Sequence, residues 1–272
     1  MRLIPLLLYA AAAAAYAGHF AWRDPRIGRF ATALLATGLL THTFLIAMQT
    51  VQAGHAPLVG TTAAISAFIW LLGVAYLYVE LTSDERSMGV FVAVLIVVLG
   101  VFPALDAEVS RRPPLLQSPL FTVHVLSVLF AYASFALAGV LGITYVLMFK
   151  EIKAKSLGFF YTRLPPLKTL DMMNGRAVVI GWTFLTIGVV IGVIWATQVQ
   201  NSPDPRAQAM SLADPKILVA IMSWVLYSFA VYARRAIGWS GRRAAWLSAI
   251  GFALVLLNFV PVGYFLTRSH NF

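Results

Sequence analysis

The sequence contains no cysteine among its 272 residues. A disulfide, a thiolate metal site and a cysteine nucleophile are therefore excluded. Charged residues are also scarce, at 11% of the chain, and only 10 of them are acidic. The sequence has no phosphate-cradling glycine loop, no paired carboxylates within an apolar segment and no serine nucleophile motif. These absences argue against a hydrolase, a nucleotide-driven pump and a carboxylate-based ion transporter, and we do not expect an enzyme.

Long hydrophobic runs take up most of the chain. Hydrophobic residues make up 60% of it, which is more apolar surface than the core of a soluble protein of this size needs. A helix of about 20 apolar residues crosses the hydrocarbon layer of a bilayer, which is roughly 30 Å thick. We therefore predict an all-α integral membrane protein, a single domain over residues 1–272 with about eight transmembrane helices. The predicted spans are Leu3–Trp22, Phe30–Val51, Thr61–Val79, Met88–Ala107, Pro119–Phe149, Ala177–Val199, Ile217–Ala233 and Ala244–Leu266.

The basic side chains predict the orientation of these spans. Of the 20 lysines and arginines, 14 lie in the segments that follow the first, third, fifth and seventh spans. Because cytoplasmic loops are enriched in Lys and Arg, we expect these segments inside and both termini on the outer, periplasmic side. The same bias explains the net charge of +10 without a nucleic-acid partner. Membrane lipid is the expected partner of the basic and aromatic segment from Lys150 to Arg176.

Three histidines fall on the predicted outer face. His55 lies in the turn from Ala53 to Pro57, His124 lies near the start of the fifth span, and His270 lies at the end of the chain. Two neutral imidazoles on facing helix ends can bind a metal or take both axial positions of a haem iron. Spacing alone does not separate such a site from three histidines without a shared role.

Polar residues inside or at the ends of the spans have more than one interpretation. His42 lies in the middle of the second span, where it either bonds to a neighbouring helix or serves as a ligand or proton relay. Tyr76, Tyr78 and Glu80 end the third span and are expected to form an aromatic belt with a charged stop at the membrane boundary.

Several short stretches, in a fixed order, resemble a known family. They are Ala53–Pro57, His124-Val125 with Tyr132-Ala133, Leu164–Leu167 with Leu170-Asp171, Gly192–Ala196, Asp214–Lys216, Gly238–Trp246, Asn258-Phe259 and Ser269-His270. In this order they resemble the cytochrome c assembly membrane proteins of the CcsA/CcmC type, and within them the YpjD/HemX-like branch. The resemblance covers nearly the whole chain and is weakest in the first fifty residues.

The resemblance implies haem handling, with haem b as the cofactor, in the bacterial inner (plasma) membrane. His124 and His270 are similar to two outer histidines that hold haem for delivery to an apocytochrome, often beside a second membrane subunit. Trp195 precedes the segment that corresponds to the family's tryptophan-rich loop, and Asp214 lies near its end. Tyr232 stands where the family has a membrane-buried histidine, although an aromatic residue at this depth is also a common interfacial anchor.

The chain departs from the family pattern in that loop. No tryptophan lies between Trp195 and Trp224, and Ala213 precedes Asp214 where the family has a tryptophan. The flat apolar wall that indoles would offer a porphyrin is therefore reduced.

Two hypotheses from other classes remain. The first is a non-catalytic regulatory protein of tetrapyrrole metabolism, similar to HemX, that acts through the cytoplasmic segment from Lys150 to Arg176. The second is a channel or transporter, which rests on His42 and Asn258 as intramembrane polar groups.

Overall fold

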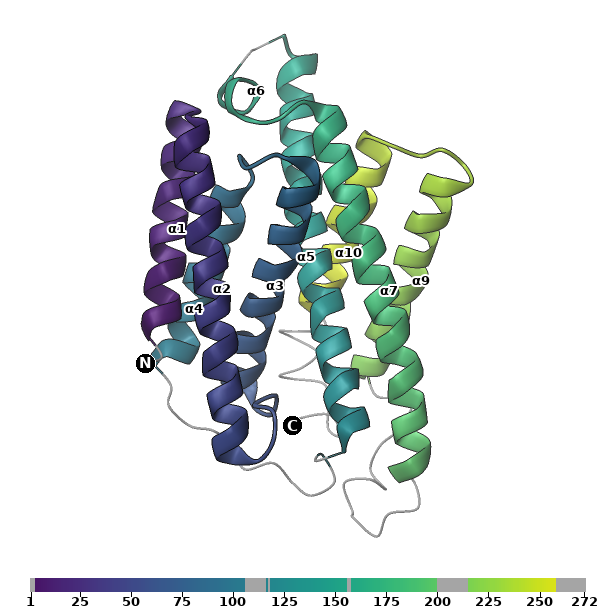
Figure 1. The fold of residues 1–272 in the computed structure, drawn as a ribbon. Coiled ribbons are helices and arrows are strands. Elements are labelled where there is room, and N and C mark those ends of the chain that lie inside the picture. Colours follow the sequence, from purple (N-terminus) through teal and green to yellow (C-terminus); the bar gives the residue numbers. More distant parts are fainter. Residues whose placement is uncertain (1–2, 106–115, 117, 156–157, 200–214, 258–272) are drawn as a thin grey trace.

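The computed structural model describes residues 3–105, 116, 118–155, 158–199 and 215–257, and their regular secondary structure is helical (Figure 1). The helices are α1 (Leu3–Trp22), α2 (Pro25–Ala53), α3 (Thr61–Ser83), α4 (Gly89–Leu105), α5 (Pro119–Lys153), α6 (Phe159–Arg163), α7 (Leu167–Val199), α9 (Pro215–Arg235) and α10 (Arg242–Leu257). Six of them are long and apolar enough to cross a bilayer. The prediction of an all-α membrane protein is therefore confirmed.

Each of the eight predicted spans overlaps a helix within the described residues, but two of these helices are short. The helix α4 has 17 residues, and the described part of α10 has 16. That these two also cross the membrane stays a prediction, as does the total of eight transmembrane helices.

The helix that contains the sixth predicted span begins before that span. The helix α7 begins at Leu167, ten residues before Ala177, and its 33 residues extend about 50 Å. Lys168, Asp171 and Arg176 lower the hydropathy of this segment, but polar side chains do not end a helix that leaves the hydrocarbon layer. The segment after the fifth span is therefore mostly helical, because α5 also continues to Lys153 and α6 follows it (Figure 1).

The two ends of the bundle differ in their side chains. At one end α2 stops before His55, α5 begins before His124 and α7 ends after Trp195, and we call it the histidine end. At the other, where α1, α3, α5 and α9 end, the described basic loops gather, and we call it the basic end (Figure 1). That the histidine end and both termini face the periplasm stays a prediction from the charge bias.

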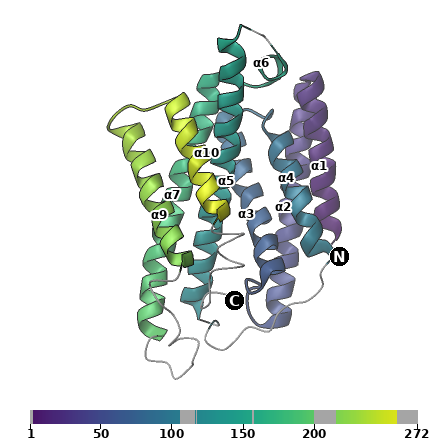
Figure 2. The ribbon, with the colours of Figure 1, turned by 180° about the vertical axis from the view of Figure 1, so that it is seen from behind.

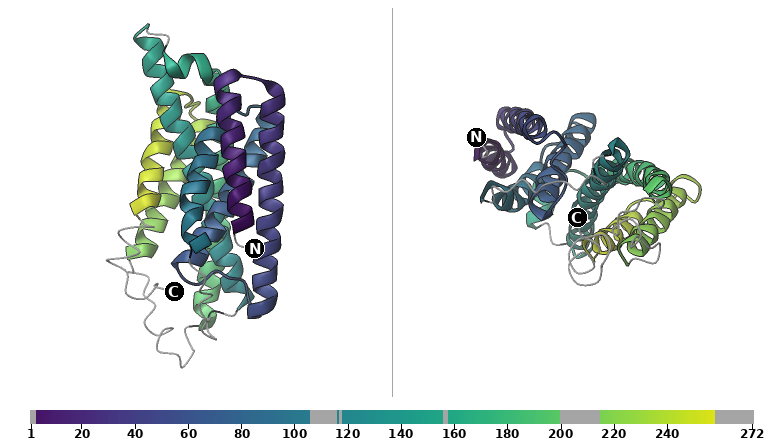
Figure 3. Two further views of the ribbon diagram at one scale, coloured as in Figure 1. Left: turned by 90° about the vertical axis from the view of Figure 1, so that its left-hand side faces the viewer. Right: turned by 90° about the horizontal axis from the view of Figure 1, so that it is seen from below.

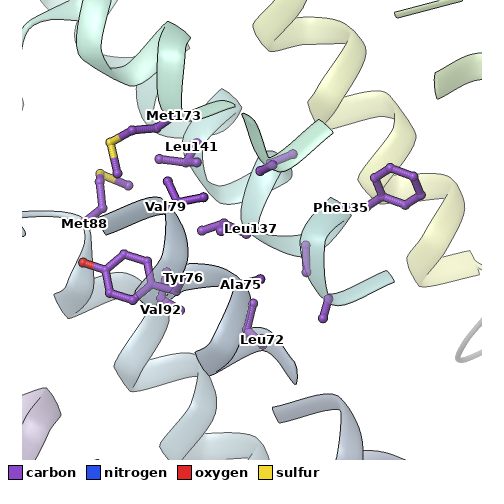
Figure 4. Packing of buried hydrophobic residues seen from close by; sticks show 14 of the residues in the cluster. Leu72, Ala75, Tyr76, Val79, Met88, Val92, Phe135, Leu137, Leu141 and Met173 are labelled. Atoms are coloured by element: carbon purple, nitrogen blue, oxygen red, sulfur yellow. The ribbon is translucent and has the colours of Figure 1, made fainter. Parts of the chain in front are cut away.

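The helices form two groups. The first contains α1 to α4, the second contains α5, α7, α9 and α10, and α3 packs against α5 between them (Figures 2 and 3). Buried side chains of both groups make one continuous core. Val79 and Met88 from the first group face Leu141 and Met173 from the second (Figure 4).

Glycines hold α7 unusually close to α5. A Cβ atom at Gly181 would lie 2.4 Å from the ring of Phe135, and one at Gly188 would lie 2.8 Å from Val128. Small residues along one helix face allow two backbones to approach closely in a membrane. We call Gly181, Gly188 and Gly192, which lie along this face of α7, the glycine seam. At the histidine end this seam determines the position of His124.

The predicted aromatic belt at the end of the third span is only partly correct. Tyr78 is exposed, as expected of a membrane-boundary residue, but Tyr76 and Glu80 are both 0% exposed. Glu80 therefore does not mark the membrane boundary, and its side chain lies in the packed core instead.

The buried carboxyl group of Glu80 ties three helices together near the basic end. Its Oε2 accepts a hydrogen bond of 2.6 Å from the hydroxyl of Tyr16 on α1, and its Oε1 accepts one from the hydroxyl of Thr32 on α2. The guanidinium of Arg86 lies 4.0 Å from the same carboxyl group. Buried polar groups are costly without partners, so this cluster fixes how α1, α2 and α3 pack.

Candidate functional site

The side chain of His124 lies against α7 at the histidine end. Its Nδ1 is 2.8 Å from the carbonyl oxygen of Gly188. A carbonyl oxygen only accepts hydrogen bonds, so Nδ1 carries a proton, and in the neutral imidazole Nε2 is then the nitrogen with the lone pair. This is the tautomer that metal-ligating histidines commonly adopt, with the non-ligating nitrogen donating to a backbone carbonyl.

The glycine at position 192 makes room for this ring. A Cβ atom there would lie 2.6 Å from both Nδ1 and Cε1 of His124, closer than real Cβ contacts allow. Gly188 and Gly192 are four residues apart and therefore lie on one face of α7. One glycine supplies the acceptor for the imidazole, and the other supplies the space that it occupies.

Next to His124 lies a small cluster of buried apolar side chains, which we call the outer cluster. It consists of Val59, Leu116, Phe121 and Trp195. The rings of Phe121 and Trp195 have centroids 5.1 Å apart. Phe121 precedes His124 by three residues and Trp195 follows Gly192 by three, so the two aromatic rings extend the contact between α5 and α7.

The indole of Trp195 is buried, and only 4% of the residue is exposed. Its Nε1 finds no acceptor among the described residues. Buried side-chain donors in native proteins are rarely left without an acceptor. Trp195 therefore places a hydrogen-bond donor beside His124 for which the described part of the chain supplies no acceptor.

His42 is buried in the first group of helices, and both of its ring nitrogens have partners. Nδ1 is 3.1 Å from the hydroxyl of Tyr9 on α1, and Nε2 is 2.9 Å from the hydroxyl of Ser66 on α3. These contacts match the interpretation of a histidine bonded to neighbouring helices. Its contact with haem stays a prediction.

His55 follows the end of α2 and shares a cavity with His42. The helix ends at Gly54, whose φ of 72° lies in the left-handed region that suits glycine. The Nδ1 of His55 is 3.2 Å from the carbonyl oxygen of Ala56. Both histidines line a cavity of about 180 Å³ at the histidine end of α1 to α4.

The structure does not bring Tyr232 to these histidines. It lies 17 residues after Pro215 at the start of α9, roughly 25 Å along the helix toward the basic end. Its side chain is 60% exposed, which is typical of an interfacial aromatic anchor. The predicted site residues Asp214 and His270, and also Asn258, lie outside the described residues.

No group of three or more potential metal ligands gathers within the described ranges. Within these ranges His124 is therefore not part of a cluster of three or more potential ligands. The donor set fits a haem iron, because His124 has the required tautomer and the neighbouring outer cluster is apolar and aromatic.

Sequence reasoning missed the residues that position these groups. The partners of His42, the acceptor of His124 and the buried state of Glu80 depend on contacts between helices that are far apart in the sequence. One signal was present: Gly188, Gly192 and Trp195 follow a helical spacing toward the end of an apolar span.

A comparison with family models returns a match over residues 3–270 to the family described as "Cytochrome C assembly protein". The chain belongs to this family.

Individual members support the assignment at low identity. The cytochrome c biogenesis protein CcsA of Guillardia theta is 23% identical over 253 residues, which cover 86% of this chain and 82% of that protein. CcsA of Heterosigma akashiwo is 26% identical over 238 residues, which cover 74% and 72% of the two chains. CcsA of a Synechococcus strain is 23% identical over 293 residues, which cover 86% and 82%.

The match to the cytochrome c assembly family covers all the helices described above and extends to His270. It therefore includes the glycine seam, His124, the outer cluster and both histidines of the cavity. The family match does not separate the CcsA/CcmC type from the HemX-like branch. It also does not fix the membrane in which this protein lies.

Proposed function

We propose that this protein holds haem at its histidine end during cytochrome c assembly, with His124 as one axial ligand and His270 as the other. The observation that carries the proposal is the hydrogen bond of 2.8 Å from His124 Nδ1 to the carbonyl oxygen of Gly188. It orients the ring and leaves Nε2 as the nitrogen that ligates iron. The family match supplies the pathway in which the haem is used.

The residues around His124 have separate tasks in this proposal. The carbonyl group of Gly188 sets the tautomer, and Gly192 keeps the ring in place by leaving no Cβ to displace it. The indole N–H of Trp195, which lacks an acceptor among the described residues, can donate to a haem propionate. A haem bound here supplies an iron with two axial positions, each of which takes one imidazole.

The chemistry of the chain favours haem b. Covalent attachment of haem as in c-type cytochromes uses cysteine thiols, and this sequence has none. The haem is therefore held by its axial ligands and by packing, and it can leave. Release on the periplasmic side of a bacterial inner membrane would present it to an apocytochrome, alone or beside a second membrane subunit, without a catalytic step by this chain.

The test is a haem titration of the purified protein in mild detergent, followed by visible spectra of the oxidised and reduced forms. We expect one low-spin haem per chain with a bis-imidazole spectrum. His124→Ala and His270→Ala should each weaken haem binding by about tenfold or more, because a ligand is lost.

The control is His19→Ala. His19 lies at the basic end, where its Nδ1 contacts the carbonyl oxygen of Asp24 at 2.8 Å. This variant should bind haem as the unsubstituted protein does. Unchanged haem affinity and spectrum in a protein that lacks both His124 and His270 side chains would contradict the proposal.

A further inference from the structure

The cavity between α1, α2, α3 and α4 is distinct from the contact between His124 and α7, although Leu126 of α5 and Val59 of the outer cluster also line it. Its polar lining residues include Tyr9, His42, Gln49, His55 and Ser66, and most of the remaining lining is apolar. The lining comes from the start of α1, the end of α2, the start of α3 and the end of α4. The cavity is therefore built within apolar helices at the histidine end.

The cavity has room for a single ring. Its volume is about 180 Å³. An apolar protein cavity of about 150 Å³ takes up benzene. A porphyrin consists of four linked five-membered rings and is far too large for this space. The space therefore fits a ligand smaller than haem, and this inference does not depend on the proposed haem site.

Hydrogen-bonding groups occur at two depths of the cavity. The deeper group is the chain Tyr9, His42 and Ser66, with contacts of 3.1 Å and 2.9 Å around the imidazole. Its two hydroxyl groups rotate, so the chain can either donate to a ligand oxygen or accept from one. The shallower group contains His55, whose Nδ1 contacts the carbonyl oxygen of Ala56 and whose Nε2 is therefore an acceptor.

Two hydroxyl-bearing residues of α3 line the cavity one helical turn apart. Ser66 belongs to the deeper group, and Thr62, which also lines the cavity, lies four residues nearer the start of the helix. Four residues correspond to about 6 Å along a helix axis. This separation is comparable to the distance across a six-membered ring that carries oxygen atoms at opposite positions.

We propose that this cavity binds the head group of a membrane-soluble quinone or hydroquinone. One ring oxygen lies against the hydroxyl of Ser66, the other lies at the level of Thr62, and the ring itself fills the apolar space. The hydroxyl and imidazole chain suits both redox forms, because it can donate to a carbonyl oxygen and accept from a hydroxyl group. A ligand with an apolar tail reaches the cavity from the surrounding membrane.

The test measures binding of a benzoquinone with a short alkyl tail to the purified protein in detergent, by calorimetric titration. The matched probe is an alkylbenzene with the same tail and no ring oxygens. We expect saturable binding of one quinone per chain, and binding of the alkylbenzene weaker by about thirtyfold, since two hydrogen bonds of roughly 1 kcal/mol each are lost.

Two alanines on α3 provide a matched pair of variants. Ala63 lines the cavity, whereas its neighbour Ala64 does not. Ala63→Leu fills the cavity and should weaken quinone binding by about tenfold or more, whereas Ala64→Leu should change it by less than about twofold. Ser66→Ala, a smaller change that keeps the volume open, should weaken binding by about fivefold through loss of one hydrogen bond.

Haem titration of the same preparations separates this proposal from the previous one. Ala63→Leu and Ser66→Ala should retain haem binding, because neither residue is part of the contact between His124 and α7. Equal binding of quinone and alkylbenzene, or equal quinone binding by Ala63→Leu and Ala64→Leu, would overturn the proposal. Absence of saturable quinone binding to the unsubstituted protein would also overturn it, whatever the haem titration shows.

Discussion

Replacing Gly192 with valine is expected to lower haem affinity by about tenfold or more, although both proposed ligands remain in the chain. A Cβ at this position would lie 2.6 Å from the ring of His124, so the imidazole must move. Once it moves, Nδ1 loses its hydrogen bond of 2.8 Å to the carbonyl oxygen of Gly188. The orientation of Nε2 is then no longer fixed.

The measurement is a haem titration of Gly192→Val beside Val193→Ala. Val193 is the next residue on α7 and its side chain is exposed, so its truncation controls for a change in this helix. Circular dichroism of each preparation establishes that the helices are intact during the titration. If folded Gly192→Val binds haem as tightly as Val193→Ala, the position of His124 does not matter for haem.

Replacing Glu80 with leucine should produce the largest loss of stability. The substitution removes the acceptor of the hydroxyl groups of Tyr16 and Thr32 and leaves the guanidinium of Arg86 without its buried partner. Leaving the buried hydroxyl donor of Tyr16 without an acceptor costs about 1–3 kcal/mol. We expect a decrease of this size in the free energy of unfolding, measured by denaturant titration in mixed micelles.

Asp84→Asn is the matched control for this substitution. Asp84 contacts the same guanidinium at 2.9 Å, but its side chain is 86% exposed. Exposed ion pairs contribute about 0–1 kcal/mol, so this variant should be nearly as stable as the unsubstituted protein. Equal stabilities of Glu80→Leu and Asp84→Asn would show that the Glu80 cluster does not hold α1, α2 and α3 together.

The fold was predictable from the sequence because apolar length determines membrane helices almost directly. All eight predicted spans overlap helices within the described residues, and the ends of α1 and the starts of α3 and α5 were correct. The start of α7 lies before the predicted span because hydropathy detects where a helix enters the hydrocarbon, whereas the helix itself continues beyond it. Glu80 was misplaced because a single acid near the end of an apolar span has the same sequence pattern whether it faces water or the core.

The candidate site was predictable only in part. The sequence placed His55 and His124 at the same end, because alternating spans and the charge bias require it. It did not indicate that the ring of His124 rests on Gly188 and Gly192, since that contact joins residues 64 positions apart. Nor did it separate His42 and His55 from His124, because the packing of α1 to α4 creates the cavity.

Chemical rescue of His124→Gly tests most directly whether Nε2 of His124 ligates the haem iron. This variant removes the imidazole and leaves space for a free imidazole from the buffer. We expect it to lose the bis-imidazole spectrum and to regain it as imidazole is added, while the double variant His124→Gly with Gly192→Val, whose site is narrowed, does not recover. Retention of the original spectrum by His124→Gly without imidazole would contradict ligation by His124.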